Sequence, residues 1–147
     1  MKVFAREPDS GPLREYWALR SPGKHTTPFC FYETLSILKG KWVHGNWLTK
    51  PGYLEASSNL FAWYATTKLS SDIDLHDSET FKKVHDLADC YSLDLSDALQ
   101  ILSVKAGRFS SLAGDSQTIL ITADKALAKA ARAEGLRVWY CIGEPEP

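Results

Sequence analysis

A strand, a helix and a second strand in close succession near the C-terminus constrain the fold more than any other feature. Residues 118–122 are a continuous β-prone run, residues 124–134 form an alanine-rich helical pattern, and residues 137–142 return to an apolar strand pattern. An unbroken apolar strand is typical of a parallel sheet that is covered on both faces. Two strands joined through a helix run parallel. The sequence therefore predicts an α/β fold with a mainly parallel sheet flanked by helices.

The rest of the chain alternates between strand and helix in the same way. Thr27 and Pro28 suit an N-cap and a first helical position, so a helix should follow a short strand at residues 25–27 and run to Gly40. The other expected elements are a helix at 12–20, a strand at 71–76, a helix from Asp77 or Ser78 to Tyr91, and a helix at 95–106. The length of 147 residues fits a single domain, residues 1–147.

Residues 41–69 carry an unusual density of aromatic side chains, and they suggest a helical hairpin interrupted at Pro51 and Gly52. A packed core or a dimer face is favoured over a platform for stacking nucleic-acid bases. The side chains that carry this expectation are Trp42, Trp47, Tyr53, Phe61, Trp63 and Tyr64.

Charge and cysteine content exclude several classes of protein. Seventeen basic and eighteen acidic residues give a formal net charge of -1, so the chain lacks the overall positive field of many nucleic-acid binders. Any nucleic acid would therefore have to be bound by positive charges at one local site. Three widely spaced cysteines suggest neither a disulfide framework nor a zinc site. The apolar runs are too short to span a bilayer, and the N-terminal residues do not form a signal peptide. We expect a cytoplasmic protein without a membrane segment.

Three carboxylates are candidate metal ligands. Glu33 has apolar helical neighbours at positions 29, 30 and 37, so we expect it to project from a largely buried face, either toward a cation or into an ion pair. Asp97 lies in the first turn of its helix and Asp124 directly follows the strand at 118–122, and each could instead serve as a cap or favour the helix dipole. Together, oxygen ligands at one sheet edge favour Mg²⁺ or Mn²⁺.

The C-terminal half of the chain resembles a PIN domain of the VapC toxin kind. The resemblance rests on Leu93-Asp94-Leu95-Ser96-Asp97-Ala98-Leu99 and on the run from Ile119-Leu120-Ile121-Thr122-Ala123-Asp124 to Gly135-Leu136-Arg137-Val138-Trp139. Glu33, after Thr26-Thr27-Pro28, matches the glutamate position of that family. The segment Phe4-Ala5-Arg6-Glu7-Pro8-Asp9-Ser10 resembles the part that follows the family's first catalytic aspartate.

This resemblance implies a metal-dependent endoribonuclease, the toxin of a toxin–antitoxin pair, in which Glu33, Asp97 and Asp124 hold Mg²⁺ or Mn²⁺ for hydrolysis of an RNA phosphodiester. It also implies an antitoxin partner and a homodimer. Two further residues have possible secondary roles in the expected site, Asp94 as an outer carboxylate or a cap and Thr122 as a hydroxyl that orients water or Asp124. The basic side chains that could hold RNA are those of Lys39, Lys41, Lys50 and Arg108, which are otherwise solvated charges.

The chain departs from the PIN pattern at its beginning. Residues 1–5 start where the family's opening strand has already ended, so neither that strand nor its catalytic aspartate is present. We expect the strands at 25–27 and 118–122 to lack their shared central neighbour, unless the native chain extends upstream, the two strands close up, or a partner subunit supplies a strand. We also expect weakened metal affinity and impaired nuclease turnover. The alternative is an inactive PIN-like module that binds a protein or RNA partner without cleaving it.

Overall fold

A computed structural model describes residues 10–19, 23–45, 47–69, 73–107, 110 and 118–147 of the chain. The chain divides into two compact units, Met1–Leu69 and Ser70–Pro147, which we call the N-terminal unit and the C-terminal unit. Helices dominate the described residues of both units, and in each unit these residues form one pair of parallel strands. The α/β class with parallel pairing is confirmed. The single PIN-like domain expected over residues 1–147 stays a prediction.

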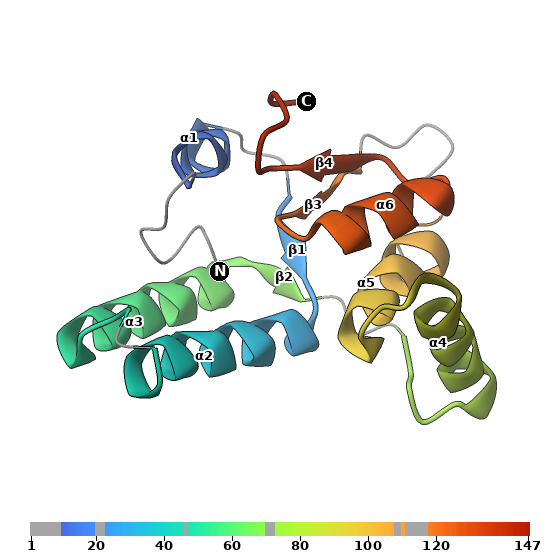
Figure 1. Cartoon of the computed structure of the whole chain (residues 1–147), viewed down its shortest axis with the longest axis horizontal. Helices are drawn as coiled ribbons and strands as arrows, with labels where there is room; N and C mark the ends of the chain where they lie inside the picture. The colour runs from blue at the N-terminus through green and yellow to red at the C-terminus, as the bar shows by residue number, and fades with distance from the viewer. Residues whose placement is uncertain (1–9, 20–22, 46, 70–72, 108–109, 111–117) are drawn as a thin grey trace. The chain divides into compact units, whose positions relative to one another are not determined.

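The N-terminal unit is built on two long helices, α2 and α3, which lie side by side (Figure 1). Parallel pairing joins the short strands that precede α2 and follow α3, with His25 opposite Lys68 and Thr26 opposite Leu69. In chain order the elements are α1 (Gly11–Leu19), β1 (His25–Thr26), α2 (Pro28–Val43), α3 (Lys50–Thr66) and β2 (Lys68–Leu69).

Local sequence signals begin both long helices. The backbone N–H of Cys30 donates to the Thr27 hydroxyl at 3.3 Å, which confirms Thr27 as the N-cap of α2. Thr49 caps α3 in the same way through the N–H of Gly52, at 3.2 Å. Pro51 has no N–H that needs an acceptor, so it suits the first turn of α3. The expected helical hairpin is thus formed by α2 and α3, with Pro51 and Gly52 in the first turn of its second helix.

The expectation that the aromatic rings of residues 41–69 are buried is confirmed only in part. Trp42 stacks on Tyr53 with ring centroids 4.9 Å apart, and both rings are half-buried. Trp47, however, is 74% exposed, and Phe61 is 54% exposed. The buried core between α2 and α3 is mostly aliphatic and contains Phe31, Leu38, Ala56 and Leu60.

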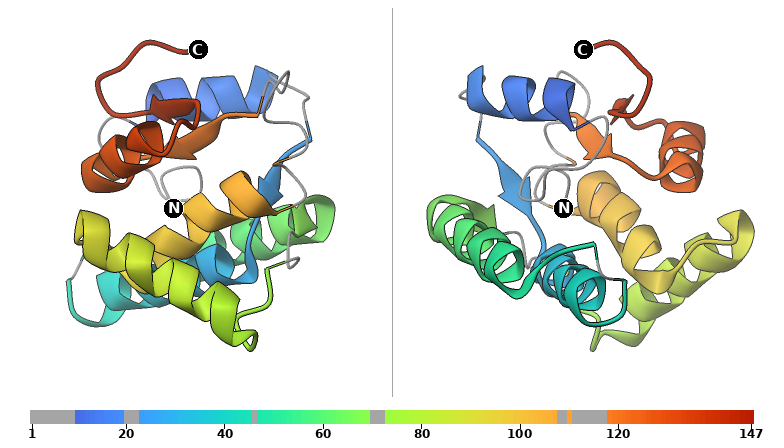
Figure 2. Two further views of the ribbon diagram at one scale, coloured as in Figure 1. Left: turned by 90° about the vertical axis from the view of Figure 1, so that its right-hand side faces the viewer. Right: turned by 60° about the vertical axis from the view of Figure 1, so that its left-hand side comes forward.

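The C-terminal unit consists of a helical hairpin followed by a βαβ unit. Figures 1 and 2 both show the two hairpin helices, α4 and α5, side by side. Strands β3 and β4 pair in parallel, with Ile121 opposite Trp139, and α6 connects them. The elements are α4 (Ser78–Tyr91), α5 (Leu95–Ala106), β3 (Leu120–Thr122), α6 (Lys125–Ala133) and β4 (Val138–Tyr140).

Two hydrophobic clusters hold this unit together. The first joins α4 to α5 and contains the buried side chains of Val84, Ala88, Ala98, Leu99 and Leu102. The second joins α5 to α6 and contains Ile101, Leu127, Ala130 and Ala131. Burial of these apolar faces supplies most of the stability of such short helices.

Three sequence expectations about strands need correction. The strand expected at 71–76 is absent from its described residues, where Asp74 Oδ1 accepts the N–H of His76 at 2.8 Å and closes a turn that competes with strand pairing. Ile73 instead packs against the cluster of α4 and α5. Strand β3 is half-buried and not covered on both faces. Finally, β1 pairs with β2 and β3 with β4, so each strand has a partner within its own unit and no single larger sheet forms among the described residues.

No helix within the described ranges is both long enough and apolar enough to cross a membrane.

Candidate acidic site

Asp97 lies in the first turn of α5, as the sequence predicts. Asp94 is the N-cap residue, and its carbonyl oxygen accepts the N–H groups of Asp97 and Ala98 at 3.1 and 3.0 Å. The side chain of Asp94 makes no capping hydrogen bond, so this exposed carboxylate is not used in starting the helix. Asp97 Oδ1 accepts a hydrogen bond from Gln100 Nε2 at 3.2 Å, which orients a half-buried carboxylate.

Asp124 follows β3 and is the N-cap of α6. Its Oδ1 accepts the N–H of Leu127 at 2.9 Å, so the capping interpretation of this residue is confirmed. The N–H of Asp124 donates to Thr122 Oγ1 at 3.0 Å, and Thr122 therefore positions the backbone of Asp124 at the carboxyl end of the strand. The carboxylate of Asp124 is exposed and has a second oxygen that the cap does not use.

A cluster of polar side chains joins the C-terminal ends of α5 and α6. The carboxylate of Glu134, which follows α6, accepts a hydrogen bond from Lys105 in the last turn of α5. Its other oxygen accepts the Tyr91 hydroxyl at 2.6 Å. One turn further back along α5, Ile101 packs against Leu127 and its neighbours in α6.

These contacts imply that α5 and α6 run in the same direction, as Figure 1 also shows. At a rise of 1.5 Å per residue, Asp97 lies about 12 Å along α5 from Lys105, and Asp124 lies about 15 Å along α6 from Glu134. Asp97 and Asp124 therefore each lie at the N-terminal end of their helix, away from the polar cluster. The positive end of each helix dipole is at that terminus, where it favours negative charge.

The polar cluster shifts two pKa values. Hydrogen bonds from Lys105 and then Tyr91 lower the pKa of Glu134, because both stabilise the carboxylate. The same carboxylate raises the pKa of Tyr91 to about 12, because ionised tyrosine would lose its hydrogen bond to Glu134. The cluster is not apparent from the sequence, since its members are 29 and 43 residues apart along the chain.

Glu33 lies in α2 of the N-terminal unit, and the expected burial around it is wrong. Glu33 is exposed, and two of its apolar helical neighbours, Phe29 and Ile37, are 48% and 40% exposed. The buried face of α2 contains Phe31 and Leu38. At about 100° per residue, Glu33 is roughly 200° around the helix from Phe31 and therefore on the opposite face. Whether Glu33 joins Asp97 and Asp124 stays a prediction, because Glu33 belongs to the other unit.

The basic residues expected to contact RNA have different surroundings. Lys39 and Lys50 are exposed, and Lys41 lies over the ring of Trp47, with Nζ 5.3 Å from the ring centroid. Arg108 lies outside the described residues. The pairing of Lys41 with Trp47 was not expected from the sequence, although one signal of a basic surface was present: residues 34–54 contain no aspartate or glutamate.

Within the described ranges, no three or more histidine, cysteine, aspartate or glutamate side chains gather in a position to hold a metal ion. Comparison of the chain with protein-family models, curated proteins and solved structures found no match in any of the three.

Proposed function

We propose that this chain is a PIN-like, divalent-cation-dependent phosphodiesterase that acts on RNA. One observation supports this most strongly: the contacts from Glu134 to Lys105 and from Ile101 to Leu127 orient α5 and α6 in the same direction, and Asp97 and Asp124 lie at the corresponding N-terminal ends of these helices. In parallel α/β structures, ligands bind beyond the carboxyl ends of strands, where the following helices begin. Asp124 has this position after β3.

The residues present suit Mg²⁺ or Mn²⁺. Mg²⁺ is commonly held by one or two carboxylates, with water and substrate phosphates completing its octahedral shell. Asp97 and Asp124 would supply those two carboxylates, and Asp94, with no capping bond of its side chain, would be an outer one. Glu33 is the further ligand that the resemblance to PIN domains implies. A cation bound there would act as a Lewis acid, lowering the pKa of an attacking water and neutralising charge on the phosphoryl oxygens.

The protein's own groups have separate tasks in this proposal. Gln100 fixes the orientation of Asp97 through its 3.2 Å hydrogen bond. Thr122 fixes the backbone of Asp124, and the cap to Leu127 fixes one carboxylate oxygen while the other faces solvent. Such fixed carboxylates lose little conformational freedom when they bind a cation, which favours binding.

Substitution of the two aspartates by asparagine tests the proposal. Asparagine caps helices about as well as aspartate, so Asp124→Asn should remove the charge and keep α6 intact. We expect Mn²⁺ to raise the melting temperature of the wild-type chain, because a ligand that binds only the folded state stabilises it. We expect Asp97→Asn and Asp124→Asn to reduce this shift and to reduce Mn²⁺-dependent cleavage of single-stranded RNA.

Asp86→Asn, which neutralises an exposed aspartate on α4, is the matched control and should leave both measurements unchanged. Equal Mn²⁺ shifts in the wild type and in both site variants would contradict the proposed metal site. RNA cleavage that persists in both variants would contradict the proposed catalytic residues.

A second candidate function is a module that binds a partner without hydrolysis. Several large apolar side chains of the N-terminal unit are exposed, and such patches mark interaction surfaces. The most exposed of them are Trp47, Tyr32, Phe61 and Leu54. RNA binding without any Mn²⁺-dependent thermal shift would favour this function over the first.

A further inference from the structure

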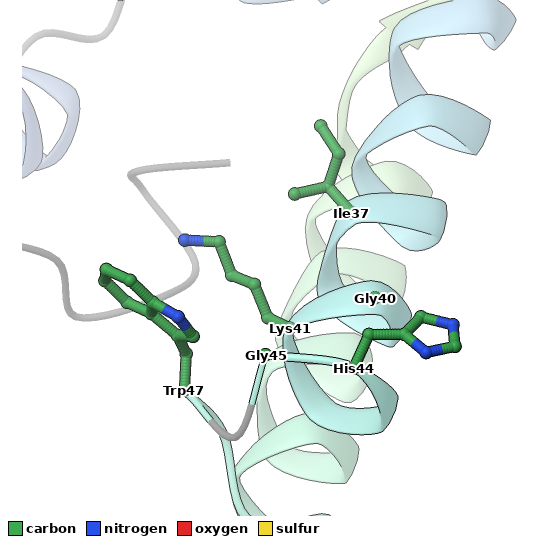
Figure 3. Close-up of a pocket in the computed structure, with 6 residues that line it drawn as sticks. All are labelled: Ile37, Gly40, Lys41, His44, Gly45 and Trp47. Atoms are coloured by element: carbon green, nitrogen blue, oxygen red, sulfur yellow. The ribbon is translucent and has the colours of Figure 1, made fainter.

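The end of α2 carries a surface hollow with an exposed tryptophan. The hollow has a volume of about 570 Å³ and is lined by Ile37, Gly40, Lys41, His44, Gly45 and Trp47. Figure 3 shows the side chains of Ile37, Lys41 and Trp47 on one side of the helix end, with His44 directed away from them. The hollow therefore has apolar walls from Ile37 and Trp47 with an ammonium group between them.

The chain holds Trp47 in place although its ring is 74% exposed. The N–H groups of Trp47 and Leu48 both donate to the carbonyl oxygen of Lys41, at 3.0 and 3.3 Å, and so fold the turn back onto the last turn of α2. Gly45 leaves room for the ring, because a Cβ atom at this position would come within 2.6 Å of Trp47 Cδ1. An exposed aromatic ring on a fixed backbone is suited to stacking.

The charge around the hollow favours a polyanion. Lys41 lines the hollow, and residues 34–54, the segment that contains all of its lining residues, include no acidic residue in a chain whose formal net charge is -1. A cation beside an exposed indole is the combination by which proteins hold single-stranded nucleic acid: the ring stacks on a base, and the ammonium group pairs with the adjacent phosphate. An apolar protein partner would not need this local excess of positive charge.

We propose that the hollow at the end of α2 is a binding subsite for one nucleotide of a single RNA strand, with a base stacked on Trp47 and a phosphate contacted by Lys41. This inference rests on the proposed action on RNA and names where the strand is held. It assigns a function to an aromatic side chain for which the sequence favoured a packed core or dimer face.

Binding of a fluorescein-labelled octauridylate, measured by fluorescence anisotropy with EDTA present, tests the subsite without any cleavage. Stacking on one aromatic side chain accounts for roughly 5- to 150-fold in affinity. We expect Trp47→Ala to weaken binding by a factor in this range, and Trp47→Phe to keep most of the affinity. Lys41→Gln should weaken binding and lower the slope of log K against log salt by about 0.7, the value for one phosphate contact on a single strand.

Two control variants remove the same kinds of side chain, an exposed aromatic ring and a lysine, at positions outside the hollow. Tyr32→Ala removes an aromatic ring that is 66% exposed and lies about 13 Å along α2 from Lys41. Lys82→Gln removes an exposed positive charge from α4. Both should bind the oligonucleotide as the wild type does, and circular dichroism should show that every variant is folded.

Wild-type affinity in Trp47→Ala, or no measurable binding of the oligonucleotide by the wild type, would overturn the proposal. A concentration-dependent dimer that Trp47→Ala dissociates, without oligonucleotide binding, would likewise overturn it and identify a protein interface. If binding depends on Trp47 but no metal-dependent cleavage occurs, the subsite stands and the proposed hydrolysis fails; if cleavage depends on Asp97 but not on Trp47, the subsite alone fails.

Discussion

Substitution of Glu134 by glutamine tests the contact that aligns α5 with α6. The glutamine amide oxygen can still accept the Tyr91 hydroxyl, but the charge that attracts Lys105 is lost. A hydrogen bond to a charged group contributes about 1 kcal/mol more than one between neutral groups. The side chain of Lys105 is 50% exposed, which limits the contribution of the ion pair to the free energy of unfolding to about 0.2–1 kcal/mol. Removing a negative charge beside the C-terminus of α6 stabilises the fold by about 0.3–0.5 kcal/mol, because the negative end of the helix dipole lies there.

The expected result for Glu134→Gln is therefore a loss of about 1 kcal/mol in the free energy of unfolding at pH 7, and for Glu134→Ala a loss of about 2 kcal/mol, because alanine also leaves the Tyr91 hydroxyl without its acceptor. Urea denaturation followed by far-ultraviolet circular dichroism measures both. Glu79→Gln is the control, since Glu79 is 77% exposed and pairs with Lys83 only within α4. Its effect should stay below about 0.5 kcal/mol.

The pH dependence distinguishes this explanation from a general loss of packing. The pKa of Glu134 is lowered from its ordinary value of 4.5, so its carboxylate stabilises the fold fully above that value. The contribution is lost as the pH falls through the lowered pKa of the folded state. The difference between the wild type and Glu134→Gln should therefore be full at pH 7 and shrink below pH 4.5. An undiminished difference in acid, or no difference at pH 7, would refute the reasoning.

Three further predictions concern the C-terminal unit. Ile101→Ala should lower the free energy of unfolding by about 2–5 kcal/mol in urea denaturation, because Ile101 is fully buried between α5 and α6; a loss below 1 kcal/mol would contradict that packing. Asp77→Ala should lower the free energy of unfolding at pH 7, because Asp77 caps α4 by accepting hydrogen bonds from the backbone N–H and the hydroxyl of Thr80. These bonds lower the pKa of Asp77, so in thermal denaturation the cost should fade as the pH falls below 3.8, and a constant cost would argue against the cap. In a spectroscopic titration, Tyr91 should ionise with a pKa of about 12, raised from the ordinary tyrosine value of 10.0, and its stabilising contribution should disappear as the pH rises from 10 through 12. Tyr91→Phe should remove that late step, and persistence of the step would assign it to another tyrosine.

Local signals made most helix boundaries predictable from the sequence. Thr27, Asp77 and Asp124 each cap the helix that the sequence assigned to them, because an N-cap depends on only three or four successive residues. The helix expected at 95–106 agrees with α5, although no side-chain cap starts that helix. The strand at Lys68–Leu69 was missed because two residues carry no periodicity, and its formation depends on β1, more than 40 residues away.

The candidate site was less predictable than the helices. The sequence correctly located Asp97 and Asp124 at helix starts, which is again local information. It misjudged Glu33, because apolar residues at 29 and 37 do not reveal whether their side of α2 is the buried one. The alignment of α5 with α6 depends on Glu134, whose contacts are between distant parts of the chain. Periodicity within one helix carries no information about such contacts.

Helix α5 contributes side chains to both hydrophobic clusters of the C-terminal unit, Ala98, Leu99 and Leu102 to one and Ile101 to the other. Opening of either cluster alone therefore leaves α5 packed in the other. The α4 side chains Leu87 and Tyr91 also pack against the second cluster, so coupling between the hairpin and the βαβ unit passes through α5 and through these two side chains. In native-state hydrogen exchange, the amides of α5 should exchange only through global opening of the unit, whereas the amides of α4 should also exchange through partial openings that leave α5 on α6.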